Sequence, residues 1–316
     1  MLIINDLFKS YGKVKALNGI SFKLVSGQIF GLIGRNGAGK TTIMRILSGL
    51  IPADSGNVQY EEVNLLQNHK ILKQQIGFMP DFFGIYNNLK VYEYMEFFAS
   101  AHGLYGLKGR NRCMELLNMV DMLDYSDSFI ENLSRGMQQR LCLARVMIPS
   151  PHFLLLDEPL SGLDPHNRSL LRSILKQFSS KGTAILLSSH NLNELTYICT
   201  HIGVLQSGKL ITQGSLTDVF HKVNTSNPLS IFVYDGLETA ISILKSHPLV
   251  RTISIDQSHI QITFTGREQE EANLLKQLIE HNVLIHSFRR EEGNLDSLFL
   301  QLTKSEEDIN VSQPNL

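Results

Sequence analysis

The chain has 316 residues, 43% of them hydrophobic, which is enough to build one large globular core or two smaller ones. Its formal net charge of −1 gives no electrostatic footprint for nucleic acid or for an anionic membrane surface, so we expect no nucleic-acid partner. Three cysteines, Cys113, Cys142 and Cys199, are widely spaced and lack metal-ligand spacing, and we expect buried thiols.

The sequence shows neither an export signal nor a membrane span. Residues 1–6 lack the basic segment, apolar stretch and cleavage site of a signal peptide. No window approaches the run of about 18 apolar residues that a membrane helix needs. We therefore expect a cytoplasmic protein, and if it works at a membrane, another chain must cross it.

The first 60 residues alternate short strand patterns with turns. Strands are predicted at residues 2–7, 20–24, 28–33 and 57–60. Residues 41–47 have the spacing of an amphipathic helix. The segment 34–41 therefore joins a buried strand to the start of a helix.

This segment matches the phosphate-binding pattern G-x-x-x-x-G-K-[ST]. Its glycines let the backbone turn tightly and aim N–H groups at phosphate oxygens, and the helix dipole adds positive charge there. Lys40 is expected to reach the β- and γ-phosphates, and the Thr41 hydroxyl to bind Mg²⁺. The predicted nucleotide contacts are Gly34, Arg35, Asn36, Gly37, Ala38, Gly39, Lys40, Thr41 and Thr42.

Residues 82–150 have mainly helical spacing, which predicts an inserted helical subdomain. Its helices are expected at residues 91–98, 114–120 and 138–147. A serine and a glycine, Ser134 and Gly136, stand where the last of these helices opens, so its start is a candidate anion site. Without further context, Ser134 is an ordinary N-cap.

Parallel-sheet patterns return after residue 150. Apolar strands at 153–156 and 184–188 are separated by a helix at about 166–179. Asp157 and Glu158 follow the first strand, at the edge where open α/β sheets bind ligands. We expect Asp157 to assist magnesium and Glu158 to orient and deprotonate the attacking water.

His190 follows the second strand, at the same edge of the predicted sheet. We expect it to contact the γ-phosphate. Asn191 and Glu194 have the spacing of a capping box, which predicts a further helix. The region is expected to end in a hairpin of residues 202–206 and 209–212.

After a polar stretch at 221–228, the pattern restarts in the order strand, helix, strand, strand, helix, strand. The segments are 229–234, 238–247, 250–256, 260–265, 268–281 and 283–290. This order is typical of a small ferredoxin-like α+β unit, which we expect a helix at 295–303 to close. The unit lacks catalytic spacing, which favours a structural or interaction module over a second active site. Residues 304–316 are expected to be a frayed tail.

With these motifs in hand, residues 1–220 resemble the nucleotide-binding subunit of an ABC transporter. The motifs stand in the family's order: the P-loop, the signature stretch at 133–140, LLLDEP at 154–159, the stretch at 161–164, and His190. The resemblance implies an α/β P-loop NTPase fold with a mixed sheet, an antiparallel β subdomain and an inserted helical subdomain (about 82–150). A small C-terminal α+β domain (229–303) follows.

The resemblance also implies functions for residues outside the P-loop. Tyr11 would stack on the adenine ring of ATP. Ser134 and Gly136 would contact the γ-phosphate bound by the opposite subunit of a homodimer, and Asp164 would communicate across that interface. Each site would thus be composite, and a monomer should hydrolyse ATP poorly. Hydrolysis of Mg-ATP would drive a separate transmembrane permease, with the ATPase on the inner face of the cell membrane.

Three residues depart from the family pattern. The signature is commonly LSGGQ, and here Arg135 and Met137 replace its first glycine and its glutamine. At the Q-loop, Asp81 stands where glutamine is common. A carboxylate can accept from water or approach magnesium, but it cannot donate as an amide does.

Residues 81–104 resemble the family surface that contacts the membrane subunit. Docking of a partner helix is favoured over an ordinary core position for Phe82, Phe83 and Tyr86. For Tyr92 and Tyr94, docking and an ordinary core position are equally open.

The C-terminal module and residues 295–303 resemble the extension of bacterial exporter ATPases of the drug-resistance and antibiotic-immunity kind, which favours export. Import is one alternative. A soluble ABC-type ATPase acting on ribosomes or DNA is another, but such proteins usually carry two ATPase units or long heptad insertions. A P-loop kinase would leave the signature stretch unexplained. The cargo is not readable, because the family places the translocation path in the membrane subunit.

Overall fold

The computed structural model describes residues 1–82, 84–219 and 228–290. The chain divides into two compact units, Met1–Leu216 and Thr217–Leu316, which are described separately. The helix expected at 295–303, the tail at 304–316 and Phe83 lie outside the described residues.

The first unit contains a four-stranded antiparallel sheet in the order β2-β1-β4-β5. Its strands are β1 (Leu2–Tyr11), β2 (Val14–Leu24), β4 (Ser55–Tyr60) and β5 (Val63–Asn64). The first two strands extend beyond the predicted segments, because their backbones continue to pair up to a turn at Gly12, which has φ 59°. Most residues of the added parts are exposed or half-buried, so the apolar patterning there is weak.

The second sheet has six strands in the order β10-β9-β3-β8-β7-β6. They are β3 (Ile29–Ile33), β6 (Ile76–Met79), β7 (Phe153–Leu156), β8 (Ala184–Ser189), β9 (His201–Gln206) and β10 (Lys209–Ser215). All neighbours pair in parallel except β10, which is antiparallel to β9. The carboxyl ends of β3, β8, β7 and β6 therefore share one edge, and the sheet is mixed, as predicted.

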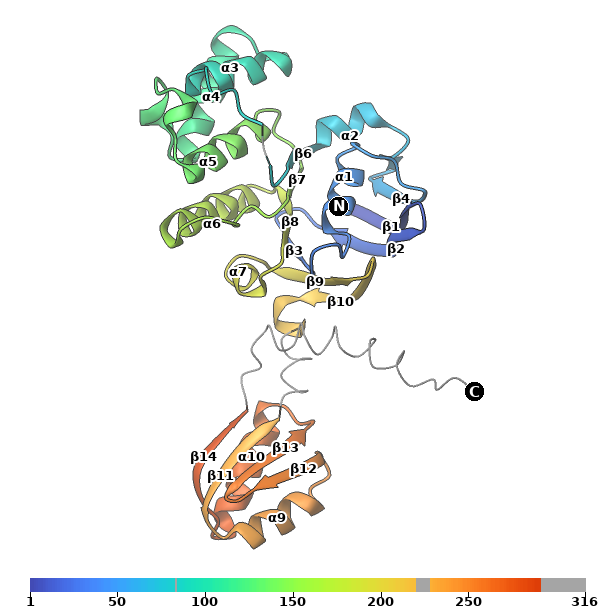
Figure 1. Cartoon of the computed structure of the whole chain (residues 1–316), viewed down its shortest axis with the longest axis vertical. Coiled ribbons are helices and arrows are strands. Elements are labelled where there is room, and N and C mark those ends of the chain that lie inside the picture. Colours follow the sequence, from blue (N-terminus) through green and yellow to red (C-terminus); the bar gives the residue numbers. More distant parts are fainter. Residues whose placement is uncertain (83, 220–227, 291–316) are drawn as a thin grey trace. The chain divides into compact units, whose positions relative to one another are not determined.

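Helix α1 (Lys40–Leu47) joins the two sheets into one core. Ile43, Met44, Ile46 and Leu47 are buried in a cluster that contains side chains from β1, β2, β3, β7 and β8. Figure 1 shows α1 beside the antiparallel strands, with α2 (His69–Gln75) nearby. These buried side chains hold α1, which follows the phosphate-binding pattern, against the core.

Three helices form the inserted subdomain, α3 (Val91–Ala101), α4 (Gly106–Met119) and α5 (Arg135–Val146). Figure 1 shows them gathered together in green beyond the edge of the six-stranded sheet. Short 3-10 turns at Leu123–Tyr125 and Ile130–Asn132 connect α4 to α5. Helix α5 begins directly after Ser134, which is the N-cap that the sequence predicts, and its hydroxyl accepts a hydrogen bond from the Met137 N–H at 3.3 Å.

The helices after β7 are α6 (Pro165–Ser180) and α7 (Leu192–Thr196). The prediction of a capping box at Asn191 and Glu194 is wrong. The Asn191 side chain accepts from the Asn193 N–H, but the Glu194 carboxylate is buried and accepts from the Ser189 hydroxyl at 2.9 Å. A buried carboxylate needs such a partner, and this one lies in the interior rather than at the helix end.

The second unit has the predicted element order. Its elements are β11 (Leu229–Asp235), α9 (Leu237–Ser246), β12 (Val250–Asp256), β13 (His259–Phe264), α10 (Glu268–Glu280) and β14 (Leu284–Arg290). The sheet order is β12-β13-β11-β14 and every pair is antiparallel, which is the ferredoxin-like arrangement. The unit has a core of its own, in which Ile231, Leu244, Ile262, Phe264 and Leu278 are fully buried.

Over the part of the chain that the structure describes, none of the helices combines the length and apolar character needed to cross a bilayer. The three cysteines are buried, as the sequence predicts. Burial raises the pKa of the Cys113 and Cys142 thiols to about 11, so both are protonated and unreactive at neutral pH.

Candidate functional site

A cavity of about 330 Å³ lies at the carboxyl edge of the six-stranded sheet. It is lined by Arg35, Asn36, Gly37, Ala38, Gly39, Lys40, Thr41, Thr42, Asp81, Asp157 and Glu158. All of these residues belong to the predicted site. They follow β3, β6 and β7, so three strands of one sheet edge deliver them to the same place.

The loop between β3 and α1 has a shape that only glycine permits at two positions. Gly37 and Gly39 have φ of 84° and 114°, and a Cβ on Gly39 would lie 2.7 Å from the Ala16 carbonyl oxygen. Gly39 is the N-cap of α1 and provides no side-chain cap. The first N–H groups of the helix therefore have no side-chain acceptor, and together with the dipole they form a binding site for an anion.

Lys40 lies folded across this loop. Its buried ammonium donates to the Gly34 carbonyl oxygen at 2.5 Å, and lies 3.5 Å from that of Arg35 and 3.6 Å from Glu158 Oε1. An ammonium group has three donors and no acceptor, so phosphate oxygens can compete with these partners for the same protons. The geometry fits a lysine that binds the phosphates of a nucleotide.

Asp157 is held by two hydroxyl groups. Thr41 Oγ1 donates to Asp157 Oδ2 at 2.8 Å, and Ser188 Oγ donates to Asp157 Oδ1 at 2.6 Å. Hydroxyl and carboxylate oxygens are the hard ligands that Mg²⁺ prefers, and Mg²⁺ usually keeps waters and substrate phosphates as its remaining ligands. The Thr41 and Asp157 side chains therefore fit a magnesium ion carried by a nucleotide.

Glu158 stands next to this pair in a strained backbone conformation, with φ 50°. Its Oε2 lies 2.9 Å from His190 Nδ1, and its backbone N–H donates to the Ser188 hydroxyl at 2.8 Å. Only 14% of the Glu158 side chain is exposed, against 55% for His190. A carboxylate in this position can accept a proton from a water molecule that enters the cavity, while the His190 imidazole holds the outer carboxylate oxygen, Oε2.

Comparisons with known proteins agree with this geometry. The sequence profile of the ABC transporter family matches residues 17–161. The linearmycin resistance ATP-binding protein LnrL of Bacillus subtilis is 30% identical over 305 residues, which cover 96% of this chain and 98% of LnrL. The chain belongs to the ABC transporter ATP-binding family. As a member of this family it binds and hydrolyses ATP.

Two further relatives of this ABC ATPase differ in how much of the chain they match. The bacitracin transport protein BcrA of Enterococcus faecalis is 32% identical and covers 94% of both chains. The methionine import protein MetN of Carboxydothermus hydrogenoformans is 33% identical over 73% of this chain and 70% of its own.

Solved ABC cassettes have the same fold. An ATP-binding subunit of an ABC transporter matches with a TM-score of 0.63 and 27% identity, over 70% of this chain and 92% of its own. A dimeric cassette in a post-hydrolysis state with ADP and Pi matches with a TM-score of 0.62 at 23% identity, over 68% of this chain and 99% of its own. The P-loop NTPase fold predicted from the sequence is confirmed.

Six predicted residues are not among the described residues that line the cavity: Tyr11, Gly34, Ser134, Gly136, Asp164 and His190. Gly34 begins the same loop, and His190 reaches the site through its contact with Glu158. Tyr11 ends β1, is half exposed, and lies 5.7 Å from the Lys9 ammonium, measured to the ring centroid. Within one copy of the ABC ATPase, Tyr11, the start of α5 and the segment 161–164 (the D-loop segment) therefore do not line the phosphate cavity.

Gly136 at the start of α5 instead packs against Asn167 of α6, which is hydrogen-bonded to Asp164. A Cβ on Gly136 would lie 2.7 Å from the side chain of Asn167, which donates to Asp164 through both its backbone N–H (2.9 Å) and its amide (2.6 Å). These hydrogen bonds hold the pKa of the Asp164 carboxyl below its ordinary value. The start of α5 is thus joined to the start of α6 through one asparagine, a contact that the sequence analysis did not identify.

Arg135, one of the residues that depart from the family signature, has a definite place. Its guanidinium lies over Gly162, where a Cβ would come within 3.0 Å of Cζ, and Gly162 has φ 71°. One turn further along α5, the Gln139 amide donates to the Pro159 carbonyl oxygen. The substitution therefore adds a contact to the D-loop segment rather than displacing it.

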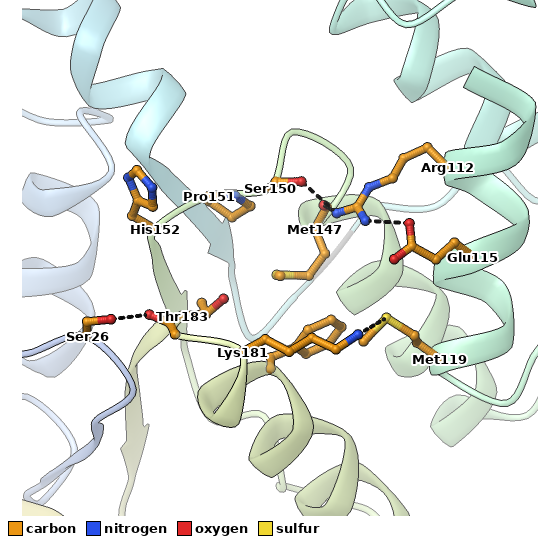
Figure 2. A pocket seen from close by; sticks show the side chains of 12 residues that line it. Ser26, Arg112, Glu115, Met119, Met147, Ser150, Pro151, His152, Lys181 and Thr183 are labelled. Carbon is orange, nitrogen blue, oxygen red and sulfur yellow. Dashed lines mark hydrogen bonds and ion pairs between the residues drawn. The ribbon is translucent and has the colours of Figure 1, made fainter. Parts of the chain in front are cut away.

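A second cavity, of about 360 Å³, lies between α4, the end of α6 and the loop before β7 (Figure 2). Arg112 donates to the Met147 carbonyl oxygen at 2.7 Å, to the Ser150 hydroxyl at 2.8 Å and to Glu115 at 2.8 Å. The guanidinium thereby ties α4 to the end of α5. Because it is already bonded on three sides, we assign this cavity a structural role.

Proposed function

We propose that this ABC ATPase powers the export of a substrate through a separate transmembrane permease, with two copies of the chain closing on two Mg-ATP. The convergence of three strand ends on one phosphate-sized cavity supports the ATP-binding part of this proposal. In this proposal the protein works in the cytoplasm, on the inner face of the cell membrane, and not on nucleic acid.

The P-loop residues hold the nucleotide in this proposal. Lys40 binds the β- and γ-phosphates, and the N–H groups of Gly34, Arg35, Asn36, Gly37, Ala38, Gly39, Lys40, Thr41 and Thr42 surround their oxygens. Thr41 and Asp157 would hold Mg²⁺, which when bound neutralises phosphate charge that develops during hydrolysis. Asp81 lines the same cavity, where its carboxylate would accept from water or approach Mg²⁺ but could not donate as an amide does.

Glu158 is the proposed general base. It orients the attacking water and takes its proton, while His190 holds the outer carboxylate oxygen and reaches toward the γ-phosphate. Because Lys40 contacts the other oxygen of the same carboxylate, both Glu158 oxygens have partners on this chain. The carboxylate is thereby held before the water arrives.

The dimer in this proposal completes each site. Ser134, Gly136, Asp164 and Tyr11 do not line the cavity of their own copy. At the capped start of α5, Ser134 and Arg135 are exposed and Gly136 is buried, so the helix start can face a phosphate of the other copy through Ser134. The dimeric cassette among the structural neighbours has the same fold. Tyr11 would stack on the adenine, and Asp164 would sense the opposite site.

The permease surface is proposed at the aromatic side chains before and on α3. Phe82 and Tyr86 are exposed by 91% and 52%, and Phe97 is half exposed beside Tyr86. Tyr94 is fully buried, and its hydroxyl accepts from Arg145 at 2.7 Å, so it belongs to the core. Exposed aromatic groups of this kind fit the apolar face of a partner helix.

The direction of transport is proposed from the extent of the matches. LnrL and BcrA match this chain over both of its units, and their names describe antibiotic resistance and bacitracin transport. The match to the importer MetN covers 73% of the chain. Import remains the second candidate because MetN has the highest identity of these three relatives.

The test is antibiotic susceptibility of a sensitive bacterial host that expresses this chain with the permease of its own genome. We expect higher resistance to bacitracin, a lantibiotic or linearmycin than with the Glu158→Gln variant in the same vector. Unchanged susceptibility to all three, with ATP hydrolysis stimulated by the permease, would contradict export of this class of compound.

A further inference from the structure

A buried hydroxyl links the two acids of the proposed catalytic pair. Ser188 lies on β8, and its relative exposure is 0%. Its hydroxyl donates to Asp157 Oδ1 at 2.6 Å and accepts from the backbone N–H of Glu158 at 2.8 Å. Because a serine has a single O–H, donation to the carboxylate leaves the oxygen lone pairs for the N–H.

The parallel register of β7 and β8 places the Ser188 hydroxyl beside Asp157. Leu156 of β7 pairs with Leu187 of β8, so the residues that follow each of them are neighbours at the sheet edge. The side chain of Ser188 therefore reaches Asp157 without distortion of either strand. Adjacent strands, rather than a local motif, create the contact.

Both partners depend on Ser188. Asp157 is 3% exposed, its Oδ1 accepts from Ser188 and its Oδ2 from Thr41 Oγ1, so the two hydroxyls set the plane of the carboxylate. Glu158 has φ 50°, a conformation that a non-glycine residue keeps only where its surroundings hold it. The hydrogen bond from its N–H to Ser188 is one such restraint.

We infer that Ser188 is a positioning residue for ATP hydrolysis: its hydroxyl orients the Asp157 carboxylate and holds the Glu158 backbone so that the general base faces the γ-phosphate. This inference rests on the proposed functions of Asp157 and Glu158. In this inference Ser188 contacts neither the nucleotide nor the attacking water. It changes the rate of turnover by orienting the metal-binding carboxylate of Asp157 and the backbone of Glu158.

The neighbouring serine provides a matched control. Ser189 is 2% exposed, and its hydroxyl donates to Glu194, not to either catalytic acid. Ser188→Ala and Ser189→Ala therefore remove equally buried hydroxyl groups from adjacent positions of one strand. Ser188→Thr keeps the hydroxyl and suits a strand.

The experiment uses the full chain and measures kcat and KM for ATP at saturating Mg²⁺, the gain in ATP affinity on adding Mg²⁺ by calorimetry, and Tm. For Ser188→Ala we expect kcat to fall by about 10- to 100-fold with KM nearly unchanged, and a smaller Mg²⁺-dependent gain in affinity. Ser188→Thr should recover most of the turnover. Ser189→Ala should change Tm but neither kcat nor the Mg²⁺ effect.

Wild-type turnover of Ser188→Ala would overturn the inference, as would an equal loss of kcat in Ser189→Ala. Should Ser188→Ala not fold, Ser188→Cys serves in its place, because the thiol has a similar shape but donates weakly, and the same loss of kcat is expected. Failure of the proposed function has a separate signature, since Glu158→Gln would then hydrolyse ATP as fast as the wild type.

Discussion

Glu158 shows how single residues make this site. Its carboxylate has Lys40 Nζ at 3.6 Å on one oxygen and His190 Nδ1 at 2.9 Å on the other, and its backbone is held by Ser188. A strained, nearly buried acid with a partner on each oxygen is placed with little freedom. Such preorganisation is what a general base needs, because the contact with His190 and the backbone hydrogen bond to Ser188 keep its orientation when Lys40 binds the phosphates.

We predict that Glu158→Gln lowers ATP hydrolysis by about 10²- to 10⁴-fold while ATP binding is retained, because the amide cannot take the proton of the attacking water. Because the bound ATP is not hydrolysed, the variant should accumulate as a nucleotide-bound dimer, which size-exclusion chromatography with Mg-ATP measures. Glu62→Gln, on an exposed acid, is the control and should behave as the wild type. An unchanged monomer in the presence of ATP would contradict the prediction.

At the scale of elements, the capped start of α5 and the D-loop segment act as one packed group. Gly136 lies against Asn167, Asn167 is bonded to Asp164, and Arg135 covers Gly162. The Arg135 substitution in the signature is therefore compatible with this packing, because Gly162 leaves room for the guanidinium. The start of α5 is thus packed directly against the start of α6.

We predict different outcomes for two substitutions at the N-cap of α5. Ser134→Ala removes the cap and should lower stability by about 0.5–2 kcal/mol, measured by thermal unfolding. Ser134→Asp keeps an equally good cap and should preserve Tm, but its carboxylate would repel the phosphate of the opposite subunit. Loss of ATP hydrolysis in the Asp variant is the expected result, and hydrolysis at the wild-type rate would argue against a phosphate contact at this helix start.

At the scale of the whole molecule, each unit has its own apolar cluster. The first cluster joins the antiparallel sheet, α1 and the six-stranded sheet, and the second fills the space between α9, α10 and the C-terminal sheet. A unit that buries its own core can fold without its neighbour. The domain boundary near residue 220 is therefore a proposal open to direct test.

We predict that a chain ending after Val219 folds and binds ATP as the full chain does, because the P-loop and its supporting sheets lie within the first unit. Calorimetry with ATP and circular dichroism measure the two properties. The full chain is the reference. An unfolded or non-binding truncated chain would show that residues of the second unit are needed for the nucleotide site.

Local pattern predicted the parts of this protein that a short segment specifies by itself. The glycine spacing of the P-loop, the acids after β7 and the element order of the C-terminal unit depend on turn geometry and on periodic burial along one strand or helix. The lining of the cavity therefore contains only residues expected from the sequence. The ferredoxin-like order was predicted for the same reason.

Tertiary structure decided which distant segments meet. The placement of β6 beside β7 brings Asp81 to the cavity, and the register of β7 with β8 brings Ser188 to Asp157 and Glu158. It also gives Glu194 a hydrogen bond from the Ser189 hydroxyl in place of the capping-box hydrogen bond that the sequence predicted. Periodicity records whether a residue is buried, but strand order and register decide against which partner it is buried.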